Sequence, residues 1–261
     1  MFGLYRRFRR GRLVERPLPD AWLGYLGEHV PFFADLDGEL RGRFLDYLKI
    51  FVWEKHWIAA GGMEITDEVK VVIAAAAVRL ALHLDMTIYD RLTEIVVYPS
   101  HYKHPDDDEG IIFGEAQDWG TVVLSWEAVV QGLANPRDGH DTATHEFAHV
   151  LDRNDGSFDG TPELRAFGDY RPWAEVMSRH FLALRDRERD ERRVLRDYGA
   201  TNEAEFFAVA TESFFEKPRQ MKERTPDLYE EMMRFYGFDP ADGREVAAPR
   251  KKRRRKKHRT R

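Results

Sequence analysis

The residues best suited to chemistry form the run His145-Glu146-Phe147-Ala148-His149, an H-E-x-x-H pattern. Residues four apart lie on one face of a helix, one turn from each other, so both imidazoles could bind one metal ion. Glu146 would then stand beside the ion, where a carboxylate acts as general base on a water that zinc acidifies. The apolar neighbours place the pair in a partly buried helix. The pattern therefore predicts a hydrolytic zinc site, and the alternative is a helix with two surface histidines and a glutamate.

A third metal ligand is needed, because catalytic zinc normally keeps three protein ligands and one open position. The metzincin extension of the motif fails, since Asp155 stands where its third histidine belongs, and Asp155 stays a weak candidate. A better source is the run at 202–212, which is mostly apolar but carries Glu205 and Glu212. Seven residues are about two turns, so both carboxylates lie on one stripe, with the small Ala208 between them. Spacing leaves open which one binds metal and which one orients a ligand imidazole.

These runs resemble the Mlc titration factor A family of zinc peptidases. The resemblance covers most of the chain and rests on four segments, which are His145–Asp152, Asn202–Val209 with Phe214 and Phe215 downstream, Ile95–Pro99, and Val122–Trp126. Val150, where the family commonly has lysine, departs from the pattern, and so does the basic C-terminus.

The resemblance implies a role for each residue of the site. The ligands of one Zn²⁺ would be His145, His149 and Glu205, with Glu146 as the base. Glu212 is then the carboxylate that accepts a hydrogen bond from a ligand imidazole. Tyr198 matches a tyrosine that the family shares with the catalytic domain of anthrax lethal factor, where it would support the tetrahedral oxyanion. A phenol can donate a hydrogen bond where negative charge develops, so the chemistry is compatible with that role.

The elements that must position these residues can be read from apolar periodicity, caps and breakers. We expect helices at 19–25, 40–53, 67–84, 127–133, 142–153, 162–189, 203–216 and 227–236, and strands at 92–98 and 121–126 around a loop at 101–119. The prediction is an α+β fold, mostly helical and zincin-like, with a small sheet beside the active-site helix. As in other zincins, the strand at 121–126 is expected to be the edge along which an extended substrate lies; the alternative is an interior strand.

Composition narrows the chemistry further. The 261 residues include no cysteine, which excludes disulfides, Cys-ligated metal and a thiol nucleophile, so any metal must bind His, Asp or Glu. The net charge of -5 is unevenly distributed, because ten of the 41 Lys and Arg lie in 250–261 and leave a strongly acidic body. No stretch approaches the roughly 20 apolar residues of a membrane span.

We expect three regions: a basic N-terminal arm at 1–12, a single zincin-like peptidase domain at 13–249, and a disordered basic tail at 250–261. The arm is interpreted as flexible, against the alternative of a short basic helix on an anionic membrane. The tail is expected to bind polyanions nonspecifically or to be merely solvated. A loop with His101, His104 and the aspartates at 106–108 is a weaker candidate for a second metal site.

The sequence thus predicts a cytoplasmic zinc metallopeptidase of the gluzincin type that acts on a peptide or protein, with aminopeptidase action and a regulatory role as finer expectations. One alternative class is a zincin scaffold that docks a transcription regulator and hydrolyses weakly or latently. Another is a nucleic-acid binder that acts through the tail. Complete catalytic motifs favour the first class, because a pure binding module does not need Glu146.

Overall fold

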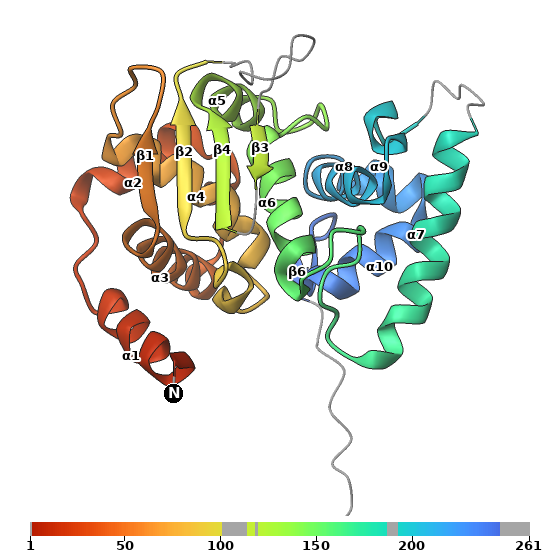
Figure 1. Ribbon diagram of the computed structural model, residues 1–261, viewed down its shortest axis with the longest axis horizontal. Helices are drawn as coiled ribbons and strands as arrows, with labels where there is room; N and C mark the ends of the chain where they lie inside the picture. Colours follow the sequence, from red (N-terminus) through yellow and green to blue (C-terminus); the bar gives the residue numbers. More distant parts are fainter. Residues whose placement is uncertain (1, 101–113, 118–119, 187–192, 246–261) are drawn as a thin grey trace, which may run out of the picture.

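The computed structural model, which describes residues 2–100, 114–117, 120–186 and 193–245, is mostly helical with a small sheet and confirms the predicted α+β fold (Figure 1). The first half of the chain holds α1 (Phe2–Val14), α2 (Asp20–His29), α3 (Gly38–Glu54), β1 (His56–Ala59), α4 (Asp67–Ala81), β2 (Glu94–Tyr98), β3 (Gly114–Gln117) and β4 (Thr121–Ser125). The second half holds α5 (Trp126–Ala134), α6 (Thr142–Asp152), α7 (Tyr170–Arg185), α8 (Glu203–Glu216), α9 (Pro218–Arg224), α10 (Pro226–Tyr236), β5 (Phe238–Asp239) and β6 (Arg244–Glu245).

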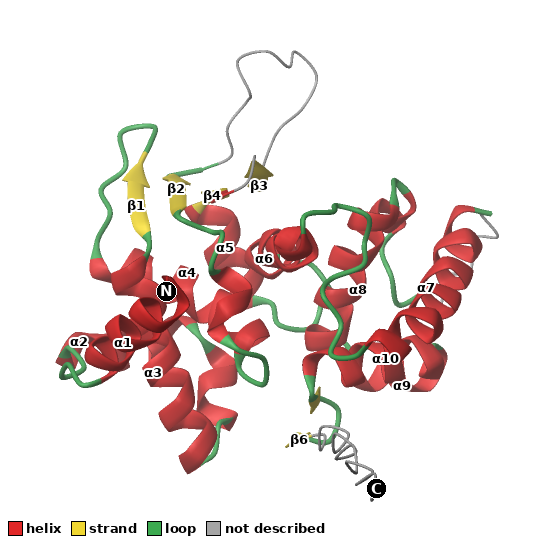
Figure 2. Ribbon diagram, turned by 60° about the horizontal axis from the view of Figure 1, so that its bottom comes forward, coloured by secondary structure: helices red, strands yellow, loops and turns green. Residues whose placement is uncertain are grey.

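The main sheet has the strand order β1-β2-β4-β3, in which β1, β2 and β4 run parallel and β3 is antiparallel at one edge. Along β2, the buried residues Ile95 and Val97 alternate with partly exposed ones, as expected for a strand covered on one face. Figure 2 shows α3 and α4 on the same side of this sheet. The helix that carries the histidine pair, α6, contacts both β4 and the edge strand β3.

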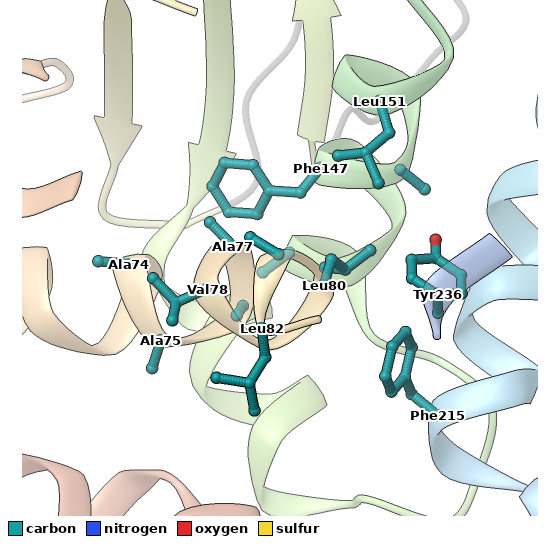
Figure 3. Packing of buried hydrophobic residues seen from close by; sticks show 14 of the residues in the cluster. Ala74, Ala75, Ala77, Val78, Leu80, Leu82, Phe147, Leu151, Phe215 and Tyr236 are labelled. Atoms are coloured by element: carbon teal, nitrogen blue, oxygen red, sulfur yellow. The ribbon is translucent and has the colours of Figure 1, made fainter. Parts of the chain in front are cut away.

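The core is organised around α4, which begins at Thr66, whose side chain accepts a hydrogen bond from the Val69 backbone N–H. Eleven of its fifteen residues are buried, so the helix is surrounded on most faces, as its sequence predicts. Figure 3 shows Phe147 from α6 above this helix and Phe215 and Tyr236 from the C-terminal helices beside it. One continuous core therefore joins the sheet layer to the helices α8 and α10.

Three expectations were wrong. The predicted arm at 1–12 is not flexible over its described residues, because 2–12 lie in helix α1, which packs against α3 with Leu13 and the paired side chain of Arg10 buried there. The expected loop at 101–119 contains the strand β3, and its remaining residues, with the candidate histidines and aspartates, lie outside the described part of the chain. Because β3 pairs with β4, the segment 121–126 holds an interior strand and β3 is the edge.

Other boundaries differ for local reasons. The helix expected from residue 162 begins at Tyr170, since a proline at 172 is tolerated only in a first turn and would clash with the preceding turn of a longer helix. The short strand β1 and the helix α9 were not expected. Neither the predicted end of α7 at 189 nor the basic tail at 250–261 falls within the described residues. Within those residues, no helix combines the length and apolar character needed to cross a membrane.

Candidate metal centre

The histidine pair is positioned by a helix with two different faces. Asp141 caps α6, because its carboxylate accepts hydrogen bonds from the backbone N–H of Thr144 at 3.0 Å and from the Thr144 hydroxyl at 2.7 Å. Phe147 lies half a turn from the histidines and is fully buried against the core (Figure 3). His145 and His149 therefore face α8, the helix that α6 packs against.

His145, His149 and Glu205 bring three ligand atoms together. The two Nε2 atoms are 3.2 Å apart, Glu205 Oε2 is 2.9 Å from His145 Nε2, and the same oxygen is 3.4 Å from His149 Nε2. A zinc ion held tetrahedrally at about 2.0–2.1 Å from each ligand requires ligand atoms about 3.3 Å apart. The measured separations are close to that value. Two imidazole nitrogens and one carboxylate oxygen also form a donor set that zinc prefers, so these residues fit a metal ion.

Glu212 lies on the other side of the His145 ring. Its Oε1 accepts a hydrogen bond from His145 Nδ1 at 2.8 Å and also pairs with the Arg196 guanidinium, while its Oε2 accepts from the Asp141 backbone N–H at 2.7 Å. The Glu212 side chain is fully buried. Its two oxygens are thus occupied by three donors, and the interaction fixes the orientation of the His145 ring.

Burial and hydrogen bonds to carboxylates decide which residues of the site are charged. Burial opposes protonation of His145, but hydrogen bonds to Glu205 and Glu212 outweigh it and raise its pKa to about 10. Burial lowers the pKa of His149, and the neighbouring His145 charge adds to this effect. Glu205 also resists ionisation through burial, yet the hydrogen bonds from both histidines bring its pKa well below the usual value. A neutral His149 and an ionised Glu205 are ready to bind a cation, whereas His145 must first lose a proton.

Glu146 and Tyr198 lie beside this group. Glu146 is buried on α6. Tyr198, in the 3₁₀ turn Asp197–Ala200 that contacts α8, is half exposed, and its ring centre is 5.8 Å from that of His145. Partial burial, together with the charges of Glu205 and Glu146, raises the pKa of Tyr198 to about 12, so the phenol keeps its proton at neutral pH. It is therefore able to donate a hydrogen bond.

The loop that follows α6 holds one wall of the centre. Asp152 is buried and accepts a hydrogen bond from the Gly160 backbone N–H at 3.0 Å, and burial raises its pKa to about 6. Phe158, between them, lies with its ring centre 5.2 Å from that of His149 and under the Arg153 guanidinium. Because Phe158 is partly exposed, the loop forms an apolar surface next to the second histidine.

Residues 5–237 match the model of a family described as glucose-regulated metallo-peptidase M90. The chain belongs to this family. An uncharacterized protein of Synechocystis sp. is 36% identical over 245 residues, which cover 89% of each chain. Mlc titration factor A of Serratia proteamaculans is 28% identical over 225 residues, or 81% of this chain and 85% of the relative. The same factor from Yersinia pestis is 27% identical over 227 residues. The predicted family is thus confirmed.

Among the M90 site residues, sequence reasoning named the three that converge on one point, and the structure also brings Glu146, Tyr198 and Glu212 next to them. Asp155 does not join this group: it is exposed in the 3₁₀ turn Arg153–Asp155, and its carboxylate accepts hydrogen bonds from Ser157. Arg196 and Phe158 were missed. No local pattern marks either residue, because both reach the centre from loops whose path depends on the fold.

Proposed function

We propose that this M90 protein is a zinc-dependent peptidase that hydrolyses peptide bonds with an activated water. The observation that carries the proposal is the triangle of His145 Nε2, His149 Nε2 and Glu205 Oε2, whose sides of 2.9–3.4 Å suit a tetrahedral zinc ion. When bound, zinc supplies Lewis-acid chemistry that acidifies a water and polarises a carbonyl group. Membership of a metallo-peptidase family supports the same reading.

Each side chain then has a proposed task. Glu146 takes the proton from the attacking water on its carboxylate and passes it to the nitrogen of the leaving amine. Tyr198 donates its phenolic hydrogen to the carbonyl oxygen as negative charge develops there. Glu212 holds His145 with its Nε2 directed at the metal position.

The substrate's extended backbone has a proposed place as well. β3 contacts α6 and is one of the two edge strands of the sheet, so among the described residues one side of its backbone has no partner strand. A peptide that adds to this edge would gain main-chain hydrogen bonds with little demand on its side chains. We therefore assign to β3 the substrate-aligning role that the sequence suggested for 121–126.

The deciding experiment combines metal analysis with cleavage of a peptide library by Glu146→Gln. We expect the wild type to purify with about one zinc and to cleave peptides. The variant should retain the zinc and lose about 10²–10⁴-fold in turnover, because a general base contributes that much. Undiminished turnover in Glu146→Gln would exclude Glu146 as the general base. A wild type that purifies without metal would contradict the proposed metal site.

Aminopeptidase action and cytoplasmic location need experiments of their own. Library members with free and acetylated N-termini distinguish aminopeptidase action from internal cleavage, since an aminopeptidase requires the free amine. Cytoplasmic location stays a prediction that fractionation of host cells would test.

A second candidate function comes from the relatives named Mlc titration factor A, a name that refers to binding the Mlc regulator. In that case this chain would dock a transcription regulator on the zincin-like scaffold. Pull-down with Glu146→Gln distinguishes the two functions, because regulator binding should survive a substitution that stops hydrolysis.

A further inference from the structure

The helix α1 presents a large apolar surface to solvent. Leu4, Tyr5 and Phe8 are 77%, 68% and 67% exposed, and they lie within about 100° of one another around the helix. Arg7 and Arg12, also exposed, flank the same face. Clustered apolar side chains of this size on a protein surface normally mark a site of interaction.

The inner face of α1 keeps this surface turned outward. Arg10 is buried and pairs with Glu54 at 2.7 Å and with Asp90 at 2.8 Å. Leu13 is buried beneath the same helix. Rotating α1 to hide the apolar face would break these ion pairs and expose Leu13, so the outward direction is a stable property of the fold. Figure 1 shows α1 at the outer edge of the molecule, beyond α3.

The surroundings of α1 are positively charged although the body of the protein is acidic. Six arginines fall within residues 1–16, and Glu15, beyond the end of the helix, is the single acidic residue there. Beside Tyr5 lies a pocket of about 320 Å³. Its charged lining consists of four cationic side chains and two carboxylates, namely Arg6, Arg9, Arg10, Lys55, Glu54 and Asp90. The carboxylates therefore leave positive charge in excess around the pocket.

Within the described residues, Arg7 and Arg12 have no ion-pair partner. Two unpaired cations next to three exposed apolar side chains match the composition of helices that lie in the interface of an anionic bilayer. The apolar residues would enter the acyl boundary, and the arginines would meet the phosphates of the headgroups.

We propose that the outward face of α1 docks this protein on a membrane surface rich in anionic phospholipids. A second copy of the chain fits this face less well, because α1 against α1 would oppose arginine to arginine. A nucleic acid would use the arginines and both aromatic rings but would leave Leu4 without a contact, since an aliphatic side chain has no ring on which a base could stack.

The test uses the full-length protein and vesicles of phosphatidylcholine with or without phosphatidylglycerol, measured by co-sedimentation. We expect binding to the anionic vesicles alone, weakened at least about tenfold in Leu4→Ser/Tyr5→Ser/Phe8→Ser. This variant keeps every charge, including those of the C-terminal tail, so the tail cannot account for its loss. The matched control Leu23→Ser/Phe167→Ser/Leu182→Ser removes exposed apolar groups from other surfaces and should bind like the wild type.

Charge is tested in the same assay. Arg7→Gln/Arg12→Gln should weaken binding by about fivefold for each arginine. Arg137→Gln/Arg219→Gln removes the same charge from exposed positions elsewhere and should have little effect. Because the chain has no cysteine, a dye on Leu4→Cys would report insertion at one known site, and its emission should shift to the blue on anionic vesicles while a dye on Leu182→Cys should not.

Several results would overturn the proposal. A wild type that fails to bind anionic vesicles, or a triple α1 variant that binds them equally well, would exclude docking through this face. Light scattering that shows a dimer lost in the triple variant, or DNA binding lost in it, without vesicle binding, would assign the face to those partners instead. None of these outcomes depends on peptidase activity.

Discussion

The two carboxylates of α8 occupy opposite sides of one imidazole ring. Glu205 faces Nε2 of His145, and Glu212 faces Nδ1 of the same ring. The seven-residue spacing predicts that both glutamates lie on one face of α8. It does not predict which of them faces the metal-binding nitrogen, because that depends on where the His145 ring lies along this face. Burial separates them: the side chain of Glu205 is 15% exposed and that of Glu212 only 1%. The outer carboxylate can receive an ion, while the inner one is closed in by its three donors.

Alanine substitutions should therefore have different effects. Glu205→Ala should remove a ligand and abolish stoichiometric zinc binding, and it should destabilise the protein less than Glu212→Ala, because His145 keeps Glu212 as a partner. Glu212→Ala should leave buried donors of His145, Asp141 and Arg196 unpaired and cost about 3–5 kcal/mol of unfolding free energy. Glu212→Gln keeps one acceptor oxygen for His145 but replaces the other oxygen with an NH2 group, so it should weaken zinc binding by about 10–100-fold without abolishing it. Zinc titration and urea unfolding measure the two effects, and a reversed order would exchange the two roles.

Metal binding should release a proton. His145, whose pKa is raised to about 10, is charged at pH 7 in the metal-free protein, whereas its Nε2 must be neutral to bind an ion. Zinc affinity should thus rise about tenfold per pH unit from pH 7 towards 10. Calorimetry in buffers of different ionisation enthalpy should give about one proton released at pH 7. Affinity that is flat over this range would contradict the assignment of His145 as a ligand.

At the scale of elements, the sequence predicts those features that depend on neighbouring residues alone, such as helix starts and the burial of a helix. Asp141 and Thr144 mark the start of α6, and the all-round apolar run of α4 marks its burial. The edge strand β3 was not predicted, because its four residues form a strand only by pairing with β4. Likewise α1 was read as a flexible arm, since the sequence does not show that Glu54 and Asp90, far along the chain, neutralise Arg10.

The approach of α8 to the loop after α6 depends on one glycine. Gly160 has φ +76°, and a Cβ there would lie 2.3 Å from the backbone oxygen of Glu203, at the start of α8. Gly160→Ala should therefore push this end of α8, with Glu205, away from the histidines and destabilise the protein by about 1–3 kcal/mol. Gly168→Ala is the control, because nothing lies within 4 Å of its Cβ position. Thermal unfolding and zinc titration should show a loss of stability and of zinc affinity in Gly160→Ala and no change of either in Gly168→Ala.

On the scale of the whole molecule, a largely buried cluster of ionisable side chains, formed by Arg79, Asp141 and Glu216, links the two halves of the chain. Glu216, at the end of α8, accepts a hydrogen bond from the His140 backbone N–H at 2.9 Å, just before α6. Arg79 of α4 lies over the Phe215 ring and donates to the backbone oxygen of the same residue. The cluster thus joins the central helix α4 to both helices of the site.

This cluster should make stability depend on pH. Burial and the nearby Asp141 raise the pKa of Glu216 to about 8 against the pull of Arg79, so the folded protein holds a proton that the unfolded chain releases near pH 4.5. The resulting stabilisation is complete below about pH 4.5 and is lost as pH rises through 8. Glu216→Gln removes this contribution, whereas Asp141, whose pKa is also raised by burial, contributes a slope of the same sign in both proteins.

Urea unfolding of the wild type and of Glu216→Gln should therefore diverge between pH 5 and pH 8. Relative to the variant, the wild type should lose up to about 3 kcal/mol across this range, because one pKa unit corresponds to about 1.4 kcal/mol. Glu223→Gln, an exposed change on α9, serves as the control and should keep the wild-type slope. If the free energies of unfolding of the two proteins change equally with pH, Glu216 is ionised in the folded state and the attraction of Arg79 outweighs the effect of burial. A divergence would instead show that α4, α6 and α8 meet around a neutral carboxyl group.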